Sequence, residues 1–395
     1  MPGFEIFGEE ERREVEEVLE TGVLFRYGFE ATRRGRFKAS EFEQDLSRRL
    51  DVPHCLLCSS GTAALCTALA AAEIGVGDEV VVPPFTFVAT LEAVILAGAV
   101  PVFADVDATL GLDPEAVERA IGPRTRAVLA VHMCGSMARI DRLVELCRRR
   151  GVMLIEDTAQ ALGATFQGRP LGTFGRMGCF SFDAVKTVTC GEGGAIATRE
   201  RELFERADQY ADHGHDHGGA NRGLDGHPIL GTNYRISELH AAVGLAQLRK
   251  LDSILATQRR NKATLEPFLS RCKDIMLREI PDPAGDSATF LTFFLPDLER
   301  AREAATELAR AGVADRIHWY DNNWHYVRRW DHLREFRTAQ RSPHHALGLV
   351  PQLERADLSQ SDAWVGRALS LPIKLSWTPA ELERIGAGFS SVFGG

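Results

Sequence analysis

Short apolar runs alternate with amphipathic segments between residues 53 and 212 of the chain. The apolar runs have the length of buried strands, and the segments between them have the period of helices. This alternation predicts βαβ units, and therefore an α/β fold with a mainly parallel sheet. Ligands of such sheets usually bind at the carboxyl ends of the strands. The predicted strands are 55–59, 79–83, 100–104, 127–132 and 152–156, and the predicted helices are 62–74, 86–97, 114–121 and 140–150.

The strict alternation ends after residue 212. Residues 213–233 are rich in Gly, His and Asp, which predicts a loop. The pattern then predicts a long helix at 237–269, strands at 275–280 and 290–295, and helices at 298–311 and 361–369. We therefore expect a large domain with an N-terminal arm in residues 1–245 and a smaller α+β domain in residues 246–395.

Composition excludes several classes of protein. The chain has 395 residues, of which 45% are hydrophobic and 26% charged, and its net charge is −9. These values argue against a disordered chain. The negative charge argues against non-specific nucleic-acid binding, which depends on Lys and Arg. The sequence has no apolar run long enough for a membrane span and no signal-peptide pattern, so a cytoplasmic protein is expected.

Cys55 and Cys58 have the spacing of some redox and metal sites. They fall in a predicted strand, where residues three apart point to opposite faces of the sheet. No second cysteine pair has the spacing of a zinc site. We therefore interpret both thiols as core residues of a protein in a reducing compartment.

Candidate chemistry begins with Lys186, which follows an apolar strand and precedes the glycine-rich segment 191–194. A desolvated lysine has a lowered pKa and can bond covalently to a carbonyl group. Asp157 ends another apolar strand, 29 residues before Lys186. Pyridoxal 5′-phosphate needs a lysine for its aldehyde and an acid for its pyridinium nitrogen. Taken singly, Lys186 is equally consistent with a lysine at the surface end of a strand, and Asp157 with a helix N-cap.

Two further segments suit the same cofactor. The turn around Gly61 and Thr62 opens a helix with small residues, which lets backbone amides face a phosphate. Phe87 follows a predicted strand and offers an aromatic face to a planar ring. The simpler alternatives are an ordinary helix cap for the turn and core packing for Phe87.

Three alternate histidines, His213, His215 and His217, invite a metal interpretation. A solvated flap or a substrate lid suits a loop so rich in Gly and His better, so no metal is expected.

Motifs along the chain resemble the DegT and StrS type of pyridoxal-phosphate-dependent sugar aminotransferases, which have the fold type I architecture. The resemblance extends from Phe4 to about Phe393. It implies aminotransfer, because members that carry histidine in place of Lys186 remove a hydroxyl group instead. The matching motifs lie at 60–65, 77–83, 85–87, 131–135, 156–160, 180–182, 186–194 and 233–238.

This resemblance also implies the roles of single residues. A phosphate contact donated by a second subunit implies a homodimer with shared active sites. The implied cofactor contacts are Lys186 with the aldehyde, Asp157 with the pyridinium nitrogen, Gln160 with the phenolic oxygen, Phe87 with the ring face, Gly61, Thr62 and Ser181 with the phosphate, and Asn233 with the phosphate in the second subunit.

A narrower resemblance concerns segments 1–5, 25–27, 131–138, 212–217, 322–326 and 373–377. They are similar to a subgroup that aminates carbon 8 of an oxidised 3-deoxy-octulosonate (Kdo), a sugar acid of bacterial lipopolysaccharide, with L-glutamate as donor. Both substrates carry carboxylates, which arginine binds well. The candidate substrate contacts are Arg26, His132, Arg235, His318, Asn323 and His325.

Two other functions stay open at this point. The chain is also consistent with amination of a nucleotide-linked keto-sugar by the same family. A non-catalytic regulator on the same fold is the alternative from another class, because fold alone does not decide function. The presence of both Lys186 and Asp157 counts against the regulator.

Overall fold

A seven-stranded sheet forms the centre of the computed structural model, which describes residues 3–219, 221–339, 341–353 and 356–394. Neighbouring strands are parallel except β9, which is antiparallel to both β1 and β8. The predicted mainly parallel sheet is therefore confirmed. The strand order is β1 (His54–Cys58), β9 (Gly194–Thr198), β8 (Met177–Ser181), β5 (Met153–Asp157), β4 (Thr125–Val131), β2 (Glu79–Val82) and β3 (Val100–Phe103).

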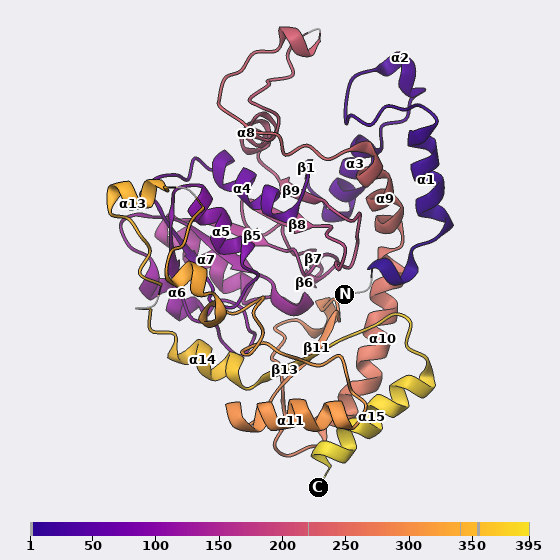
Figure 1. Cartoon of the computed structure of the whole chain (residues 1–395), viewed down its shortest axis with the longest axis vertical. Coiled ribbons are helices and arrows are strands. Elements are labelled where there is room, and N and C mark those ends of the chain that lie inside the picture. Colours follow the sequence, from indigo (N-terminus) through magenta and orange to yellow (C-terminus); the bar gives the residue numbers. More distant parts are fainter. Residues whose placement is uncertain (1–2, 220, 340, 354–355, 395) are drawn as a thin grey trace.

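Helices cover both faces of this sheet (Figure 1). Leu56 of β1 packs in a core that also includes α4 and α8, whereas Leu57 packs with Phe42 of α3 and Leu245 of α9. Successive side chains of β1 therefore point to opposite faces of the sheet, and both faces are buried. The helices are α3 (Lys38–Leu50), α4 (Gly61–Ala71), α5 (Ala89–Leu96), α6 (Pro114–Ala120), α7 (Ile140–Arg150), α8 (Arg201–Ala211) and α9 (Glu238–Arg249).

The same alternation settles the position of the cysteine pair. Cys58 packs with Leu56 on one face of the sheet and Cys55 packs with Leu57 on the other. All eight cysteines are free thiols. The interpretation of the pair as core residues is confirmed.

The N-terminal segment lies against the outside of the large sheet's helices. It contains the 3-10 helix η1 (Gly3–Ile6), α1 (Glu9–Leu19) and α2 (Glu30–Arg33). Helix α1 packs against α9, and the buried Glu11 carboxylate accepts hydrogen bonds from Gln247 and Lys250. The predicted motif at residues 1–5 includes Met1 and Pro2, which lie outside the described residues.

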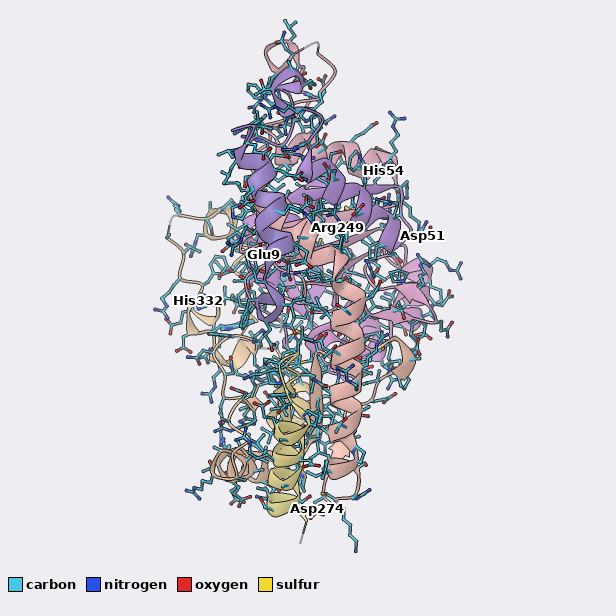
Figure 2. All side chains as sticks on the ribbon, turned by 90° about the vertical axis from the view of Figure 1, so that its right-hand side faces the viewer. Glu9, Asp51, His54, Arg249, Asp274 and His332 are labelled. Atoms are coloured by element: carbon cyan, nitrogen blue, oxygen red, sulfur yellow. The ribbon has the colours of Figure 1, made fainter. Side chains whose placement is uncertain are left out.

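A second, antiparallel sheet occupies the other end of the molecule. Its strand order is β10 (Met276–Leu277), β11 (Phe290–Phe294), β13 (Ala368–Pro372) and β12 (Ile317–His318). Figure 2 shows α10 (Leu251–Ser270) leading from the end of α9 near Arg249 toward Asp274, with α15 (Pro379–Phe393) along its side. The other helices of this part of the chain are α11 (Leu298–Arg310), α12 (Asp331–Arg334), α13 (Pro343–Leu347) and α14 (Ser359–Gly366). Figure 1 shows α13 beside the helices of the large sheet, where His344 contacts the Ala99 carbonyl. A small hairpin of β6 (Thr165–Phe166) and β7 (Arg169–Pro170) completes the strands.

Two predicted helices differ from the structure. The expected helix at 237–269 is two helices, α9 and α10, that meet at Lys250. The expected helix at 361–369 ends at Gly366, and the following residues form β13 in the middle of the small sheet. A short apolar run buried among other elements suits either a strand or a helix, so its period alone could not separate them.

The described residues of the predicted loop at 213–233 contain the 3-10 helix η3 (Arg222–Leu224) between irregular segments. This loop projects from the same end of the molecule as α2 (Figure 1). Among the residues that the structure describes, no helix has both the length and the apolar composition needed to cross a bilayer.

Candidate active site

Lys186 lies in the turn that joins β8 to β9. Its amide donates to the Asp183 carbonyl at 3.0 Å, and its own carbonyl accepts from the Gly3 amide at 3.0 Å. The pKa of Lys186 is lowered because burial disfavours the ammonium form, although the charges of Asp157 and Asp183 oppose this effect. A lowered pKa increases the neutral, nucleophilic fraction of this amine.

Asp157 is the last residue of β5, which pairs in parallel with β8. The parallel pairing brings Asp157 and the Lys186 turn to the same edge of the sheet. The carboxylate is 5% exposed and accepts from the Thr90 hydroxyl at 2.9 Å and the Ala159 amide at 3.1 Å. Burial raises the pKa of Asp157, and these two hydrogen bonds and the charge of Lys186 oppose the rise. No helix begins at Asp157, so it is not an N-cap.

Thr90 was absent from the residues expected at the site. It lies in the first turn of α5, and its hydroxyl is also 2.7 Å from that of Thr86. In the helix expected at 86–97, threonines four residues apart would share one face, and this spacing is the signal that could have identified Thr90, although α5 begins only at Ala89. Thr90 therefore supports the buried carboxylate, and Thr86 contacts Thr90.

An anion cradle forms where α4 begins. Ser60 caps the helix by accepting from the Ala63 amide, and Gly61 is its first residue. A Cβ atom placed on Gly61 would lie 2.7 Å from Ser181 Cβ and 3.0 Å from Ser181 Oγ. Gly61, the half-buried Thr62 and the Ser181 hydroxyl therefore meet at a helix N-terminus, where amide groups and the helix dipole favour a phosphate.

Phe87 and His325 lie beside each other next to the end of β2. Phe87 is 45% exposed, and its ring centre is 5.7 Å from that of His325. Gln160 places its side-chain nitrogen 3.2 Å from His325 Nε2 and accepts from the Cys134 amide through its oxygen. Burial and the charge of Lys186 lower the pKa of His325 to about 3, so this imidazole is neutral near pH 7.

The segment that carries His325 comes from the second half of the chain. The Thr86 amide donates to the His325 carbonyl at 2.9 Å, and Phe85 forms an antiparallel bridge with Tyr326. This bridge fixes His325 beside the residues that follow β2.

His132 differs from the expectation of a side chain that faces a ligand. It is fully buried, its Nε2 is 2.9 Å from Glu156, and its Nδ1 accepts from the Ala138 amide at 3.3 Å. Glu156 also accepts from the amides of Gly172, Phe174 and Gly175. The His132 amide donates a hydrogen bond to the Asp157 carbonyl, so His132 stabilises the end of β5.

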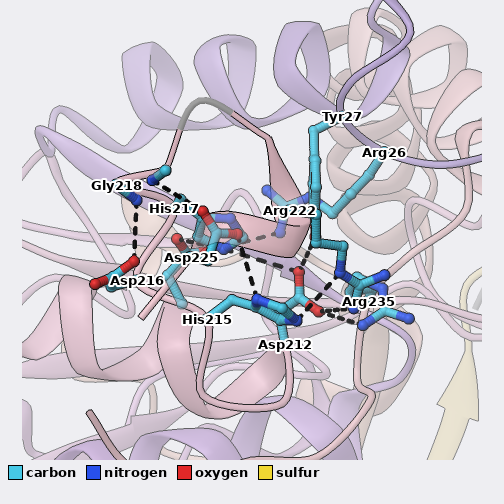
Figure 3. Close-up of polar contacts among 12 residues, drawn as sticks. Arg26, Tyr27, Asp212, His215, Asp216, His217, Gly218, Arg222, Asp225 and Arg235 are labelled. Atoms are coloured by element: carbon cyan, nitrogen blue, oxygen red, sulfur yellow. Dashed lines mark hydrogen bonds and ion pairs between the residues drawn. The ribbon is translucent and has the colours of Figure 1, made fainter. Parts of the chain in front are cut away.

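Arg26 and Arg235, the predicted carboxylate contacts, are both engaged by acidic side chains of the chain itself. Arg26 binds Glu43 at 2.7 Å. Figure 3 shows Asp212 between Arg235, Arg222 and the Tyr27 hydroxyl, all of which hydrogen-bond to its carboxylate. Burial acts to raise the pKa of Asp212, but these partners hold it below the ordinary value.

Asn233 is exposed and forms a bridge with Asp212, so it belongs to the same cluster. Its side-chain oxygen accepts from the Arg235 amide. The neighbouring Tyr234 carbonyl accepts from the Ser59 amide at 2.7 Å, which ties this segment to the strand before the cradle.

The other two candidates lie on the segment between β12 and α12. Asn323 is exposed, and its carbonyl accepts from the Trp330 indole. His318 is not free for a substrate, because its ring nitrogens contact Asp321 at 3.0 Å and the Gly366 carbonyl at 2.7 Å. These contacts instead join β12, which carries His318, to the end of α14.

The predicted loop histidines make contacts with acidic residues. His215 lies 3.3 Å from Asp225, and His217 lies 3.4 Å from Asp208. Within the described ranges, no group of three or more His, Cys, Asp or Glu side chains has the arrangement of a metal site.

The arrangement as a whole fits pyridoxal phosphate. A buried acid, an amine with a lowered pKa, an exposed aromatic face and an anion cradle converge at the carboxyl edge of the sheet. Each of these groups matches one part of that cofactor: ring nitrogen, aldehyde, ring face and phosphate.

Comparison with known proteins identifies relatives along most of the chain. A family model for the DegT/DnrJ/EryC1/StrS aminotransferase family matches residues 5–390. An L-glutamine:2-deoxy-scyllo-inosose aminotransferase of Streptomyces kanamyceticus is 40% identical over 274 residues, 67% of this chain and 64% of that protein. A GDP-perosamine synthase of Caulobacter vibrioides is 40% identical over 238 residues, 60% of this chain and 63% of that protein. The matched segments thus span less than two thirds of both relatives.

Solved structures resemble the entire fold. An aminotransferase from Psychrobacter cryohalolentis superposes with a TM-score of 0.83 at 26% identity, covering 98% of this chain and 97% of that one. The architecture is therefore fold type I, with the antiparallel β9 inside an otherwise parallel sheet.

Proposed function

Since the chain belongs to the DegT/DnrJ/EryC1/StrS aminotransferase family, whose cofactor is pyridoxal 5′-phosphate, we propose that it is an aminotransferase with L-glutamate as amino donor. The observation that carries this proposal is the convergence of Lys186 and Asp157 on neighbouring strand ends. The cradle of Gly61 and Ser181 lies at the same edge of the sheet.

Each residue has a task that follows from its surroundings. The cofactor, when bound, withdraws electrons from the carbon that carries the amino group. Ionised Asp157 holds a proton on the ring nitrogen, and Lys186 Nζ, with its lowered pKa, takes the proton from the α-carbon of glutamate. In the second half of a ping-pong reaction, the same amine returns a proton to the carbon of the acceptor sugar.

The remaining contacts hold the ring in place. Phe87 would cover one ring face, and the first turn of α4 with Thr62 and Ser181 would hold the phosphate. Gln160 would contact the phenolic oxygen, and neutral His325 fixes the orientation of the Gln160 amide. Asn233 extends from its loop to the phosphate of the second subunit in a homodimer.

For the acceptor, we propose carbon 8 of an oxidised 3-deoxy-octulosonate, which makes the chain an 8-amino-3,8-dideoxy-manno-octulosonate transaminase of lipopolysaccharide biosynthesis. Segments that resemble this subgroup border the site. Gly3 contacts the carbonyl of Lys186, and His325 contacts Gln160. The other proposed substrate contacts are Asn323, Arg26 and Arg235. In the structure, Arg26 is paired with Glu43 and Arg235 with Asp212, so a substrate carboxylate would compete with these acidic side chains for the guanidinium groups.

A nucleotide-linked keto-sugar is the second candidate acceptor, because a GDP-perosamine synthase is among the relatives. The test is a panel in which glutamate is the donor and oxidised octulosonate or GDP-linked keto-sugars are acceptors. Formation of 8-amino product from the octulosonate alone supports the first candidate. Turnover only with a nucleotide-linked sugar replaces it with the second, and no spectral change on adding glutamate favours the non-catalytic regulator.

The role of Lys186 has a separate test. Borohydride reduction of the holoenzyme followed by peptide mapping is expected to find the cofactor on the Lys186 peptide. The Lys186→Ala variant is expected to retain cofactor but lose the half-reaction with glutamate, while Lys374→Ala, an exposed lysine paired with Asp315, keeps it. An adduct on another peptide, or unchanged turnover of Lys186→Ala, contradicts the assignment.

We further propose a cytoplasmic homodimer and a division into a large domain of residues 1–245 and a small domain of residues 246–395. The division is supported by the two sheets, whose strands do not mix along the chain. Residue 245 lies in α9, close to its junction with α10 at Lys250.

A further inference from the structure

Gly3 lies against the turn that carries Lys186. Gly3 is buried, and its amide donates to the Lys186 carbonyl at 3.0 Å. A Cβ atom placed on Gly3 would lie 2.5 Å from the Lys186 carbonyl oxygen and 3.0 Å from Thr189 Cγ2. Only a residue without a side chain lets two backbones approach so closely. The N-terminal segment therefore holds the backbone of the proposed catalytic lysine directly.

Glu5 links the same segment to the part of the chain that carries the small sheet. Its Oε2 accepts hydrogen bonds from the Ser376 amide at 2.9 Å and from the Ser376 hydroxyl at 2.6 Å. Ser376 lies between β13, a strand of the small sheet, and α15. Hydrogen bonds to an ionised carboxylate are about twice as strong as those between neutral groups. Glu5 therefore fixes the position of the N-terminal segment relative to the small sheet.

Lys250 anchors this segment at a third point. Its ammonium group donates to the Ile6 carbonyl at 2.9 Å and binds the Glu11 carboxylate at 2.7 Å. Glu11 is fully buried, and Lys250 stands where α9 ends and α10 begins. Such an ion pair resists displacement, because a buried charge that loses its partner is costly. Residues 3–11, which we call the N-terminal strap, thus contact the Lys186 turn, the segment before α15 and the junction between α9 and α10.

We propose that Glu5 is a positioning residue for Lys186, which acts through the N-terminal strap. While Glu5 is bound to Ser376, the Gly3 amide stays on the Lys186 carbonyl, and the turn between β8 and β9 keeps one conformation. This inference rests on the proposed function, in which Lys186 Nζ moves a proton to and from substrate carbons. A displacement of about 1 Å in such a group can cost about 100-fold in rate. Since Ser376 follows β13, the strap also makes the position of Lys186 depend on that of the small sheet.

Hydrogen exchange of the holoenzyme, followed by mass spectrometry of peptides that cover residues 183–191, tests the contact itself. Glu5→Ala removes the acceptor of both Ser376 bonds, so the amides of this turn are expected to exchange about tenfold faster. Glu5→Gln retains an acceptor oxygen and is expected to restore most of the protection. Glu9→Ala is the matched control, because Glu9 is exposed and its ion pair is with Arg12 of the same helix.

The half-reaction with glutamate separates positioning from a purely structural role. Glu5→Ala is expected to lower its maximal rate about tenfold and to leave the glutamate concentration at half-maximal rate unchanged, whereas Glu5→Gln recovers the rate. Ser376→Ala covers poor folding of Glu5→Ala, because it removes only the hydroxyl contact and leaves the amide contact in place. It is expected to produce changes of about threefold in the same direction.

Three outcomes overturn the proposal. They are unchanged exchange of the turn in Glu5→Ala, an equal effect of Glu9→Ala, and faster exchange with an unchanged rate of the half-reaction. The exchange measurement needs no turnover. An unmodified protein without a glutamate half-reaction therefore contradicts the proposed function, while the exchange data still decide whether Glu5 holds the Lys186 turn.

Discussion

The Thr90 hydroxyl donates a hydrogen bond to Asp157, and removing this hydroxyl tests how the bond lowers the pKa of the carboxylate. Thr90→Val keeps the shape of the side chain but removes the hydroxyl that donates to Asp157 at 2.9 Å. The carboxylate then keeps the Ala159 amide as its hydrogen-bond donor from the protein. Since burial already raises the pKa of Asp157, losing one donor raises it further and disfavours the ionised form.

The size of the effect follows from the kind of bond lost. A hydrogen bond to a charged group contributes about 1.5–3 kcal/mol. At about 1.4 kcal/mol per pH unit, the acidic limb of the pH–rate profile moves up by about 1–2 pH units. Activity at a pH on that limb therefore falls about 10- to 100-fold, because Asp157 must be ionised to hold the proton on the ring nitrogen.

The assay is the half-reaction with glutamate, followed by cofactor absorbance across the pH range in the holoenzyme. Thr90→Ser retains the hydroxyl and is expected to follow the unmodified protein. Thr86→Val is the matched control, because Thr86 contacts Thr90 and not the carboxylate. Coincident profiles for Thr90→Val and the unmodified protein, or an equal shift in Thr86→Val, refute the reasoning.

Three further perturbations test other parts of the site. Gly61→Ala places a Cβ 2.7 Å from Ser181 Cβ and is expected to weaken cofactor binding by about 10- to 100-fold in titrations of the apoenzyme. Adding Ser181→Gly is expected to restore part of the lost affinity. Unchanged affinity of Gly61→Ala for the cofactor contradicts the assignment of the phosphate site. Asp212→Asn is expected to lower the free energy of unfolding in urea by about 3–5 kcal/mol at pH 7. Because the folded pKa of Asp212 is lowered, that difference shrinks as the pH falls below about 3.9, and a constant difference contradicts it. His325→Gln removes a histidine whose folded pKa is about 3, so below pH 6.5 the unmodified protein loses stability relative to the variant by up to about 1.4 kcal/mol per pH unit; parallel stability curves contradict this.

Much of the fold was predictable because its elements are local patterns. The predicted helix at 140–150 coincides with α7, where apolar residues recur at helical spacing between flanking charges. The break at Lys250 was missed because α9 and α10 both continue a helical pattern across it. Strand β13 was missed because its place is decided by pairing with β11 and β12, which are distant in the sequence.

The candidate site divides in the same way. Lys186, Asp157 and Gly61 stand at strand ends or helix starts, so their positions follow from the local pattern and parallel pairing. Polar contacts between distant parts of the sequence decided the rest. Arg235 is held by Asp212, and His132 by Glu156, and no spacing in the sequence announces either partner.

The bridge between Phe85 and Tyr326 has a consequence for biosynthesis. It places His325 beside Phe87 only after the long stretch of chain between these two residues has emerged from the ribosome. Contacts so far apart in sequence form late and slowly in folding. A nascent chain that ends before this segment can build strands β1 to β9 but lacks one wall of the cofactor pocket, so we expect the cofactor to be captured only after this segment has been synthesised.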